Sequence, residues 1–270
     1  MTNFSKRIGF IGLGRMGTAL LESFLNGGFP ASQASFIESD EQKAKHITQK
    51  LGVQSKGLDV LLNESNLIFL CVKPQQLPSV LTSMKPYLNP ETCLVSIAAG
   101  VTIAQLQVIH ESQPVIRVMP NTPIMVSEGV SAMVVSETVD KNTQSMVFTL
   151  LSSLGLVVHV KEEHLDGITG LSGSGPAYMY RVASIISDAV LSEGLESSLA
   201  RQIAAQTLIG AGKMLLESDK SPDALISDVM SPNGTTEAGM MVFDESNIDS
   251  ELSAVIKRAV ARSKELSKEF

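Results

Sequence analysis

Short apolar runs and helical patterns alternate along roughly the first 160 residues of the chain. Several of the runs, which are rich in Val, Ile and Phe, are apolar at consecutive positions, as is typical of strands covered on both faces. The predicted strands are Arg7–Ile11, Ser35–Ser39, Asn66–Val72, Thr92–Ala98, Val115–Met119, Val130–Ser136 and Leu156–Val160. Met16–Asn26 is predicted as the first helix, because Gly27 and Gly28 are good stop residues. This alternation predicts an α/β fold with a doubly wound, mostly parallel sheet.

The pattern changes after about His164, where no further strand signal is found. Apolar residues at helical spacing predict a helix over Pro176–Gly194, with proline near its start and glycine as its stop. The next segment is apolar nearly all round over Ile203–Ala211, which is typical of a buried helix. We expect a partner subunit to cover it. The chain is therefore divided into residues 1–162 and an all-helical part, residues 163–270.

Composition narrows the classes of protein. The 270 residues are 44% hydrophobic and 18% charged, which suits a globular chain, and the net charge of −7 is unlike a nucleic-acid-binding surface. The apolar runs are strand-sized, so we expect no membrane span, and the N-terminus lacks the apolar stretch of a secretory signal. Cys71 and Cys93 each lie in an apolar run, which favours free thiols and a cytoplasmic location.

The stretch GFIGLGRMG carries glycines at the spacing G-x-G-x-x-G, at positions 12, 14 and 17. After a strand and before a helix, Gly12 allows the tight turn, Gly14 lets backbone approach a pyrophosphate, and Gly17 lets the helix pack closely. Unpaired N–H groups at the helix start then face the phosphates. This is the Rossmann-type fingerprint for a dinucleotide; a tight turn without a ligand is the alternative.

Glu38 follows the second predicted strand, 21 residues after Gly17, where such folds carry an acidic residue. A carboxylate there accepts a hydrogen bond from a ribose 2′-hydroxyl and repels a 2′-phosphate, which favours NADH. Arg15, Ser39 and Lys43 lie close enough to receive a phosphate instead. The cofactor is therefore expected to be NADPH or NADH, and the choice between them stays open.

Three more stretches follow predicted strands, at the edge where ligands bind in such sheets: Cys71–Gln75, Ser96–Val101 and Arg117–Pro123. The small residues Ala98, Ala99 and Gly100 would let a ribose or nicotinamide ring lie against backbone, and Asn121 could hold a carboxamide. Ordinary turns at strand ends are the alternative.

Two stretches stand out in the helical part. Leu171–Tyr178 places Ser172 and Ser174 between glycines before a helix, and Ser231–Gly239 forms a hydroxyl-rich turn before another. Each is expected to offer free backbone N–H groups and hydroxyl donors to a small carboxylate. Simple N-capping is the alternative.

Taken in order, the motifs GFIGLGRMG, VKP, SIAAGV, MPNTP, LSGSGPAY and SPNGTT resemble those of pyrroline-5-carboxylate reductases nearly end to end. The resemblance implies a Rossmann domain followed by an all-helical domain that forms an intertwined homodimer, often built into a larger ring. It implies reduction of the C=N bond of 1-pyrroline-5-carboxylate by NAD(P)H to L-proline, the last step of proline biosynthesis.

The resemblance also implies roles for single residues. The matched cofactor positions are Gly12, Leu13, Gly14, Arg15, Met16, Gly17, Val72, Lys73, Pro74, Ala98 and Ala99. Thr236 matches a hydroxyl near the substrate ring nitrogen and is the catalytic candidate, and Ser231, Gly234 and Thr235 match the turn whose backbone holds the substrate carboxylate. The family usually has Gly where this chain has Asn233, and a common Lys-Asp pair is absent before the turn, which leaves the role of Asp228 open.

Two other functions would also suit parts of this sequence. A β-hydroxyacid dehydrogenase also suits the glycine motif, but it needs a catalytic Lys, and Pro176–Gly194 has none. An imine can arrive protonated and yields a neutral amine, so a site without strong acids suits it. A non-catalytic NAD(P)H-binding protein on the same fold is the second alternative. No metal site is expected.

Overall fold

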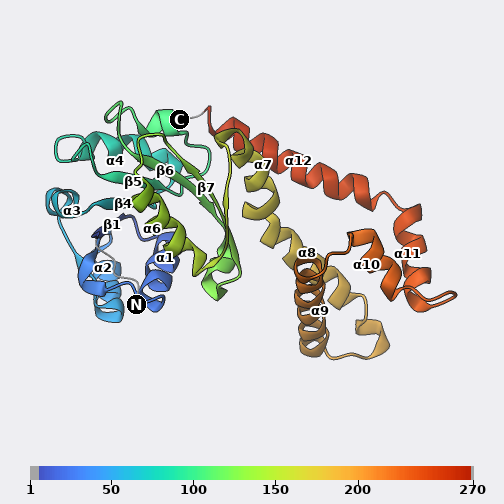
Figure 1. Cartoon of the computed structure of the whole chain (residues 1–270). Coiled ribbons are helices and arrows are strands. Elements are labelled where there is room, and N and C mark those ends of the chain that lie inside the picture. The colour runs from blue at the N-terminus through green and yellow to red at the C-terminus, as the bar shows by residue number, and fades with distance from the viewer. Residues whose placement is uncertain (1–5, 269–270) are drawn as a thin grey trace. The chain divides into compact units, whose positions relative to one another are not determined.

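One eight-stranded sheet organises the N-terminal part of the computed structural model, which describes residues 6–268 (Figure 1). The strands are β1 (Ile8–Ile11), β2 (Ala34–Ile37), β3 (Gln54–Ser55), β4 (Leu67–Leu70), β5 (Cys93–Ser96), β6 (Val115–Pro120), β7 (Gly129–Val135) and β8 (Gly155–His159). Their order is β3-β2-β1-β4-β5-β6-β7-β8, and every pairing is parallel except the antiparallel β6–β7 pair. The predicted doubly wound, mostly parallel sheet is confirmed.

Helices cover both faces of this sheet. The α-helices are α1 (Arg15–Asn26), α2 (Glu41–Leu51), α3 (Leu58–Glu64), α4 (Leu77–Met84), α5 (Ile103–Leu106) and α6 (Lys141–Ser152). Buried residues of α1, α2 and α6 join one apolar cluster, and those of α3, α4 and α5 join a second. Short 3-10 turns connect them: η1 (Ala31–Gln33), η2 (Pro74–Gln76), η3 (Thr122–Val126) and η4 (Glu162–His164).

Strand β4 shows why consecutive apolar residues are needed. All four of its residues are buried, with Leu67 and Phe69 in one cluster and Ile68 and Leu70 in the other. Successive side chains of a strand point to opposite faces, so a strand covered by helices on both sides must be apolar throughout.

After β8 the described chain is helical. The elements are α7 (Leu165–Ile168), the π-helical turn η5 (Thr169–Gly173), α8 (Gly175–Asp188), η6 (Leu191–Glu193), α9 (Ser197–Glu217), α10 (Pro222–Val229), α11 (Thr235–Glu245) and α12 (Ile248–Leu266). The all-helical second part is confirmed. No helix among the described residues is both long and apolar enough to cross a membrane.

The chain divides into two compact units. The dinucleotide unit, as we call it, comprises Met1–Ser174 and Arg258–Phe270, and the helical unit comprises Gly175–Lys257. The C-terminal part of α12 therefore belongs with the sheet. The boundary at residues 162 and 163 stays a prediction.

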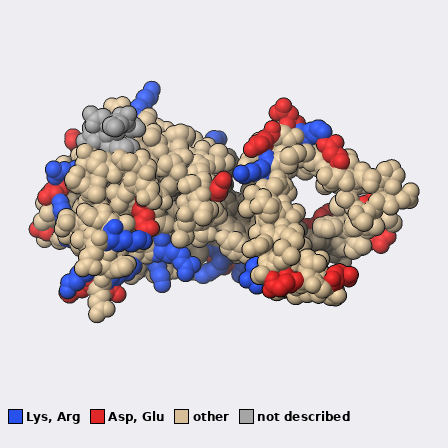
Figure 2. Space-filling view, turned by 90° about the horizontal axis from the view of Figure 1, so that it is seen from below, with Lys and Arg blue, Asp and Glu red and all other residues tan. Residues whose placement is uncertain are grey.

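The helical unit exposes much apolar surface. Helix α9, expected to be buried, has only Ala200 and Ala204 buried, while Ile203 and Ile209 are about half exposed. Figure 2 shows broad uncharged areas over the helices of this unit. The sequence predicts that a partner subunit covers this helix, and the apolar residues that α9 exposes in the single chain are in keeping with that prediction.

Candidate cofactor and substrate site

The predicted cofactor residues gather along one edge of the sheet. Parallel strands end at the same edge, and β1, β2, β4, β5 and β6 are parallel to one another. The segments that follow them are Gly12–Gly17, Glu38–Ser39, Val72–Pro74, Ala98–Ala99 and Asn121. This carboxyl edge is where dinucleotides bind in doubly wound sheets.

The glycine turn has the geometry that a pyrophosphate needs. Gly12 has a φ of +84°, and a Cβ atom there would lie 2.6 Å from Val72 Cγ1. A Cβ on Gly17 would lie 2.6 Å from the Gly12 carbonyl oxygen, so helix α1 packs directly on the turn. By contrast, the space beside Gly14 is open, no side chain caps α1, and its first turn has no acidic residue. The helix start can therefore receive an anion.

The Glu38 carboxylate joins this turn to the end of β2. Its Oε2 atom accepts hydrogen bonds from the Leu13 backbone N–H at 3.3 Å and from Lys43 Nζ at 2.9 Å, and Oε1 accepts from the Ser39 hydroxyl and the Asp40 N–H. Burial alone would raise the pKa of Glu38, but the hydrogen bonds from Lys43 and from the Asp40 and Leu13 N–H groups, together with the charge of Lys43, lower it below its usual value. The carboxylate is therefore ionised at neutral pH.

Two segments follow β4 and β5. Lys73 is exposed, Val72 and Pro74 are half-buried, and Val72 lies against Gly12 of the glycine turn. Ala98 is buried, with its N–H bonded to the Ser96 hydroxyl at 3.3 Å, and Ala99 is half-buried. Neither alanine brings a bulky side chain to the edge, which suits close approach of a ring to backbone.

Asn121 has partners inside the protein for both polar atoms of its side chain. Nδ2 donates to the Ser172 carbonyl at 3.1 Å, and Oδ1 accepts from the Val130 N–H at 2.8 Å. The side chain thus ties the end of β6 to η5. Its role toward a nicotinamide carboxamide stays a prediction.

The expected free helix start at Ser172 and Ser174 is wrong. Ser172 lies within the π-helical turn η5, and its hydroxyl donates to the Ile168 carbonyl at 3.1 Å. Ser174 has helical backbone angles, and its N–H donates to Thr169 O at 2.9 Å. The wide π turn lets helical bonding continue where an open end was expected. A role of either serine toward substrate stays a prediction.

The turn before α11 does present an open helix start. Gly234 occupies the N-cap position, and no side chain caps the helix. Asn233 adopts a φ of +58°, the left-handed conformation that Asn tolerates better than most residues. Its N–H donates to Glu237 Oε2 at 2.7 Å. Ser231 and Thr235 are exposed and Thr236 is half-buried, so hydroxyl and amide donors are accessible here.

Asp228, whose role was open, forms an ion pair with Lys220 at 2.5 Å. Burial raises the pKa of Cys71 and raises that of Cys93 to about 12, which disfavours the thiolate form of both residues. Both cysteines are free. Among the described residues, no group of three or more His, Cys, Asp or Glu side chains is placed to hold a metal ion.

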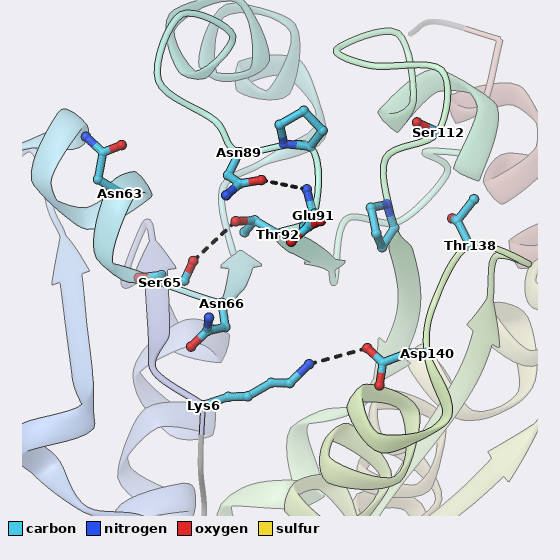
Figure 3. A pocket seen from close by; sticks show the side chains of 12 residues that line it. Lys6, Asn63, Ser65, Asn66, Asn89, Glu91, Thr92, Ser112, Thr138 and Asp140 are labelled. Carbon is cyan, nitrogen blue, oxygen red and sulfur yellow. Dashed lines mark hydrogen bonds and ion pairs between the residues drawn. The ribbon is translucent and has the colours of Figure 1, made fainter.

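A polar pocket of about 640 Å³ lies at the opposite edge of the sheet (Figure 3). Its lining includes Asn66, Thr92 and Pro114, each just before a parallel strand, and Lys6, which pairs with Asp140 at 3.3 Å. It is separate from the carboxyl edge and takes no part in the candidate site.

Sequence reasoning missed one pair of residues near the carboxyl edge. Arg117, buried on β6, donates to Glu162 Oε1 at 2.6 Å, and the same oxygen accepts from the Ile103 N–H at 2.8 Å. The two charged residues are 45 positions apart in the chain, so no local pattern could have paired them.

Two family models match the chain. The model described as pyrroline-5-carboxylate reductase dimerisation matches residues 162–266, and the model described as NADP oxidoreductase coenzyme F420-dependent matches residues 7–100. Among curated relatives, a pyrroline-5-carboxylate reductase of Methanosarcina acetivorans is 37% identical, covering 98% of this chain and 99% of the relative. One from Pisum sativum is 35% identical, covering 97% of each.

Solved structures agree. A pyrroline-5-carboxylate reductase of Coxiella burnetii superposes with a TM-score of 0.91 at 30% identity, covering 98% of this chain and 99% of that one. The Plasmodium falciparum pyrroline carboxylate reductase, solved with NADP bound, gives 0.88 at 27% identity, covering 97% and 98%. With both units matched over nearly their whole length, this chain belongs to the pyrroline-5-carboxylate reductase family.

Proposed function

We propose that this protein reduces the C=N bond of 1-pyrroline-5-carboxylate to L-proline with NADPH or NADH, the last step of proline biosynthesis. The observation that carries the proposal is similarity to reductases of this name over nearly the whole chain. The open glycine turn after β1 and the uncapped turn before α11 supply one anion site in each unit.

The carboxyl edge of the dinucleotide unit suits NAD(P)H. The uncapped start of α1 and the open space beside Gly14 would receive the pyrophosphate. Because β2 and β5 lie on opposite sides of β1, Glu38 and Ser39 would face the ribose of the adenosine end, and the segments after β4 and β5 would face the nicotinamide end. We assign to the cofactor Gly12, Leu13, Gly14, Arg15, Met16, Gly17, Glu38, Ser39, Val72, Lys73, Pro74, Ala98 and Ala99. When bound, the reduced nicotinamide supplies a hydride.

The turn before α11 suits the substrate. We assign Ser231, Gly234 and Thr235 to the substrate carboxylate. The Gly234 N–H already donates to the Ser231 carbonyl at 2.9 Å, so the hydroxyls and the N–H groups of the first turn of α11 would bind the carboxylate. Thr236 hydrogen-bonds the ring nitrogen. The iminium carbon gains the hydride, its C=N π electrons move to nitrogen, and the product is a neutral secondary amine, so orientation suffices without a strong acid.

The test is direct. Purified protein is mixed with 1-pyrroline-5-carboxylate and NADH or NADPH, loss of nicotinamide absorbance is followed, and proline is identified as the product. Turnover with either cofactor supports the proposal, and no turnover with both rejects it. A parallel assay with a β-hydroxyacid and NAD(P)⁺ tests the dehydrogenase alternative, which would oxidise the hydroxyacid and reduce NAD(P)⁺.

We further propose a homodimer formed through the helical part, with rings of dimers as the larger assembly. The match to a dimerisation model over residues 162–266 and the exposed apolar residues of α9 support the dimer. Two free thiols support a reducing compartment such as the cytoplasm. Mass measurement in solution checks the assembly.

A further inference from the structure

The C-terminal end of α12 packs on the loop that follows β5. Gly100 lies in this loop, Ile97–Thr102, and has a φ of +77°. A Cβ atom at Gly100 would lie 3.1 Å from both Leu266 Cβ and the Ser267 backbone nitrogen. Gly100 is buried, so Leu266 and Ser267 cover the loop directly. Figure 1 shows the last turn of α12 beside the sheet.

A single glutamine side chain bonds the loop to Leu266–Ser267, the segment that we call the chain end. Gln105 Oε1 accepts from the Thr102 N–H at 2.7 Å and completes the capping box of α5. Its Nε2 donates to the Ser267 carbonyl at 3.2 Å. The same amide therefore caps the helix after the loop and fixes the chain end to it.

Two further bonds hold the contacting pieces in place. The Ser263 hydroxyl, nearly fully buried, donates to Asp166 Oδ1 at 2.6 Å and anchors the last turns of α12. Glu162 accepts from the Ile103 N–H, and so fixes the far end of the loop. All these residues belong to the dinucleotide unit. The loop is thus held from the strand, from Glu162 and from the chain end.

We propose that Leu266 and Ser267 are positioning residues for the cofactor: they hold the loop Ile97–Thr102 in the conformation that receives the nicotinamide end of NAD(P)H. The inference rests on the proposed function, because Ala98 and Ala99 of this loop are assigned there to the cofactor. Strand β5 lies on the opposite side of β1 from β2, so this loop is remote from Glu38 and the adenosine end. A loosened loop therefore weakens binding of the nicotinamide half alone.

Gln105→Glu tests the bond at one atom. Glutamate keeps the capping oxygen but replaces the Nε2 donor by an oxygen facing the Ser267 carbonyl. We expect the dissociation constant and KM for NADH to rise about threefold to tenfold, the range for one lost hydrogen bond between polar groups. The dissociation constant for ADP-ribose, which lacks nicotinamide, stays unchanged. Ser263→Ala, which removes the hydrogen bond that anchors the last turns of α12, should likewise raise the dissociation constant for NADH and leave that for ADP-ribose unchanged.

The matched control is Gln107→Glu. Gln107 Nε2 also donates to a backbone carbonyl, that of Gln113 at 2.9 Å, but on the side away from the chain end. We expect the variant Gln107→Glu to leave the ratio of NADH affinity to ADP-ribose affinity unchanged. The proposal is overturned if Gln105→Glu and Ser263→Ala weaken the binding of NADH and of ADP-ribose equally, or if neither variant alters NADH binding. It is also overturned if Gln107→Glu weakens NADH binding while ADP-ribose binding stays unchanged.

Binding separates this proposal from the proposed function. If the unmodified protein binds NADH but does not reduce 1-pyrroline-5-carboxylate, the proposed function fails and the affinity ratio still decides the role of the chain end. If turnover occurs and the ratio does not change, only the positioning role fails. An unmodified protein that binds neither NADH nor NADPH overturns both.

Discussion

Two glycines of the same turn do different physical work. Gly14 has open space where a Cβ would stand and a φ of −60°, which alanine adopts freely, whereas a Cβ on Gly17 would strike the Gly12 carbonyl. Gly14→Ala should therefore leave thermal stability unchanged and weaken NADH binding at least about tenfold, because the methyl group meets the pyrophosphate. Gly17→Ala should lower the free energy of unfolding by about 1–3 kcal/mol, as overpacking does. Thermal melts and NADH titrations measure both; a destabilised Gly14→Ala would contradict this reading.

Thr236 is the residue on which the chemical step depends in the proposed site. Loss of its hydroxyl removes a hydrogen bond to a ring nitrogen whose charge changes during the reaction. Thr236→Ala should lower kcat about 10- to 100-fold, corresponding to a bond to a charged group, while the NADH dissociation constant stays unchanged. Thr236→Ser, which keeps the hydroxyl, should restore most of the rate. If Thr236→Ala weakens NADH binding as much as it lowers the rate, the role is misassigned.

Glu38 is the residue that we propose sets the cofactor preference at the adenosine end. Its lowered pKa keeps the carboxylate charged at neutral pH, where it repels a 2′-phosphate, although Lys43 offsets part of that charge. Glu38→Ala should shift the ratio of kcat/KM toward NADPH by about tenfold, equal to about 1.4 kcal/mol. Glu41→Ala, an exposed acidic change three residues on, is the control. An unaltered ratio would remove Glu38 from cofactor selection.

At the level of elements, α6 depends on one capping carboxylate. Asp140 accepts from the Thr143 N–H at 2.9 Å and from the Thr143 hydroxyl. Hydrogen bonds from the Thr143 hydroxyl and N–H, with a smaller contribution from Lys6, lower the pKa of Asp140 to about 2. Asp140→Ala should therefore lower the free energy of unfolding by about 1 kcal/mol at neutral pH.

The same cap predicts a pH dependence. Since the pKa of Asp140 is depressed on folding from its usual 3.8 to about 2, its stabilisation is present above about pH 4 and is lost as pH falls toward 2. Denaturant unfolding of the native chain and Asp140→Ala at several pH values should give curves that converge in that interval. Glu137→Ala, exposed before the same helix, is the control and should differ little at any pH.

Elements with a strong period were predictable from the sequence, and weakly patterned ones were not. The buried strands can be recognised in the sequence because helices on both faces of the sheet require unbroken apolar runs, as in β4. Strand β3, only Gln54–Ser55 and exposed, pairs with β2 through backbone alone and leaves no hydrophobic signal. Glycine and serine at 172–175 suggested an open helix start, but the π turn there is held by backbone bonds that composition does not encode.

The candidate site also has a part that could be predicted from the sequence and a part that could not. Its cofactor edge could be predicted, because glycine spacing and strand ends are local features that the parallel sheet brings to one edge. The support of that edge could not: Gln105 meets Ser267 162 positions away, and Arg117 meets Glu162 45 positions away. Such pairs depend on how the chain returns to the sheet, which only the three-dimensional structure specifies.

At the scale of the whole molecule, the helical unit of a single chain leaves apolar surface exposed to water. Ile203 and Ile209 on α9 are 50% and 51% exposed, and Leu216 on the same helix is 81% exposed. Monomeric proteins rarely leave large contiguous apolar patches in water, and burying them contributes roughly 25 cal/mol per Å². A second copy, which presents an identical surface, is the partner that the dimerisation family model favours.

This predicts that the native chain sediments as a dimer or a larger assembly at micromolar concentration. Ile203→Lys and Ile209→Lys each place a charge in that surface, where desolvation without a partner is costly, and should weaken self-association at least about tenfold. Gln49→Lys adds the same charge on exposed α2 of the dinucleotide unit and should leave the mass unchanged. Since the proposed NADH site lies in the dinucleotide unit, the two α9 variants should still bind NADH, which separates lost assembly from misfolding. A native chain that sediments as a monomer, or α9 variants that assemble like it, would show that α9 is not the subunit contact.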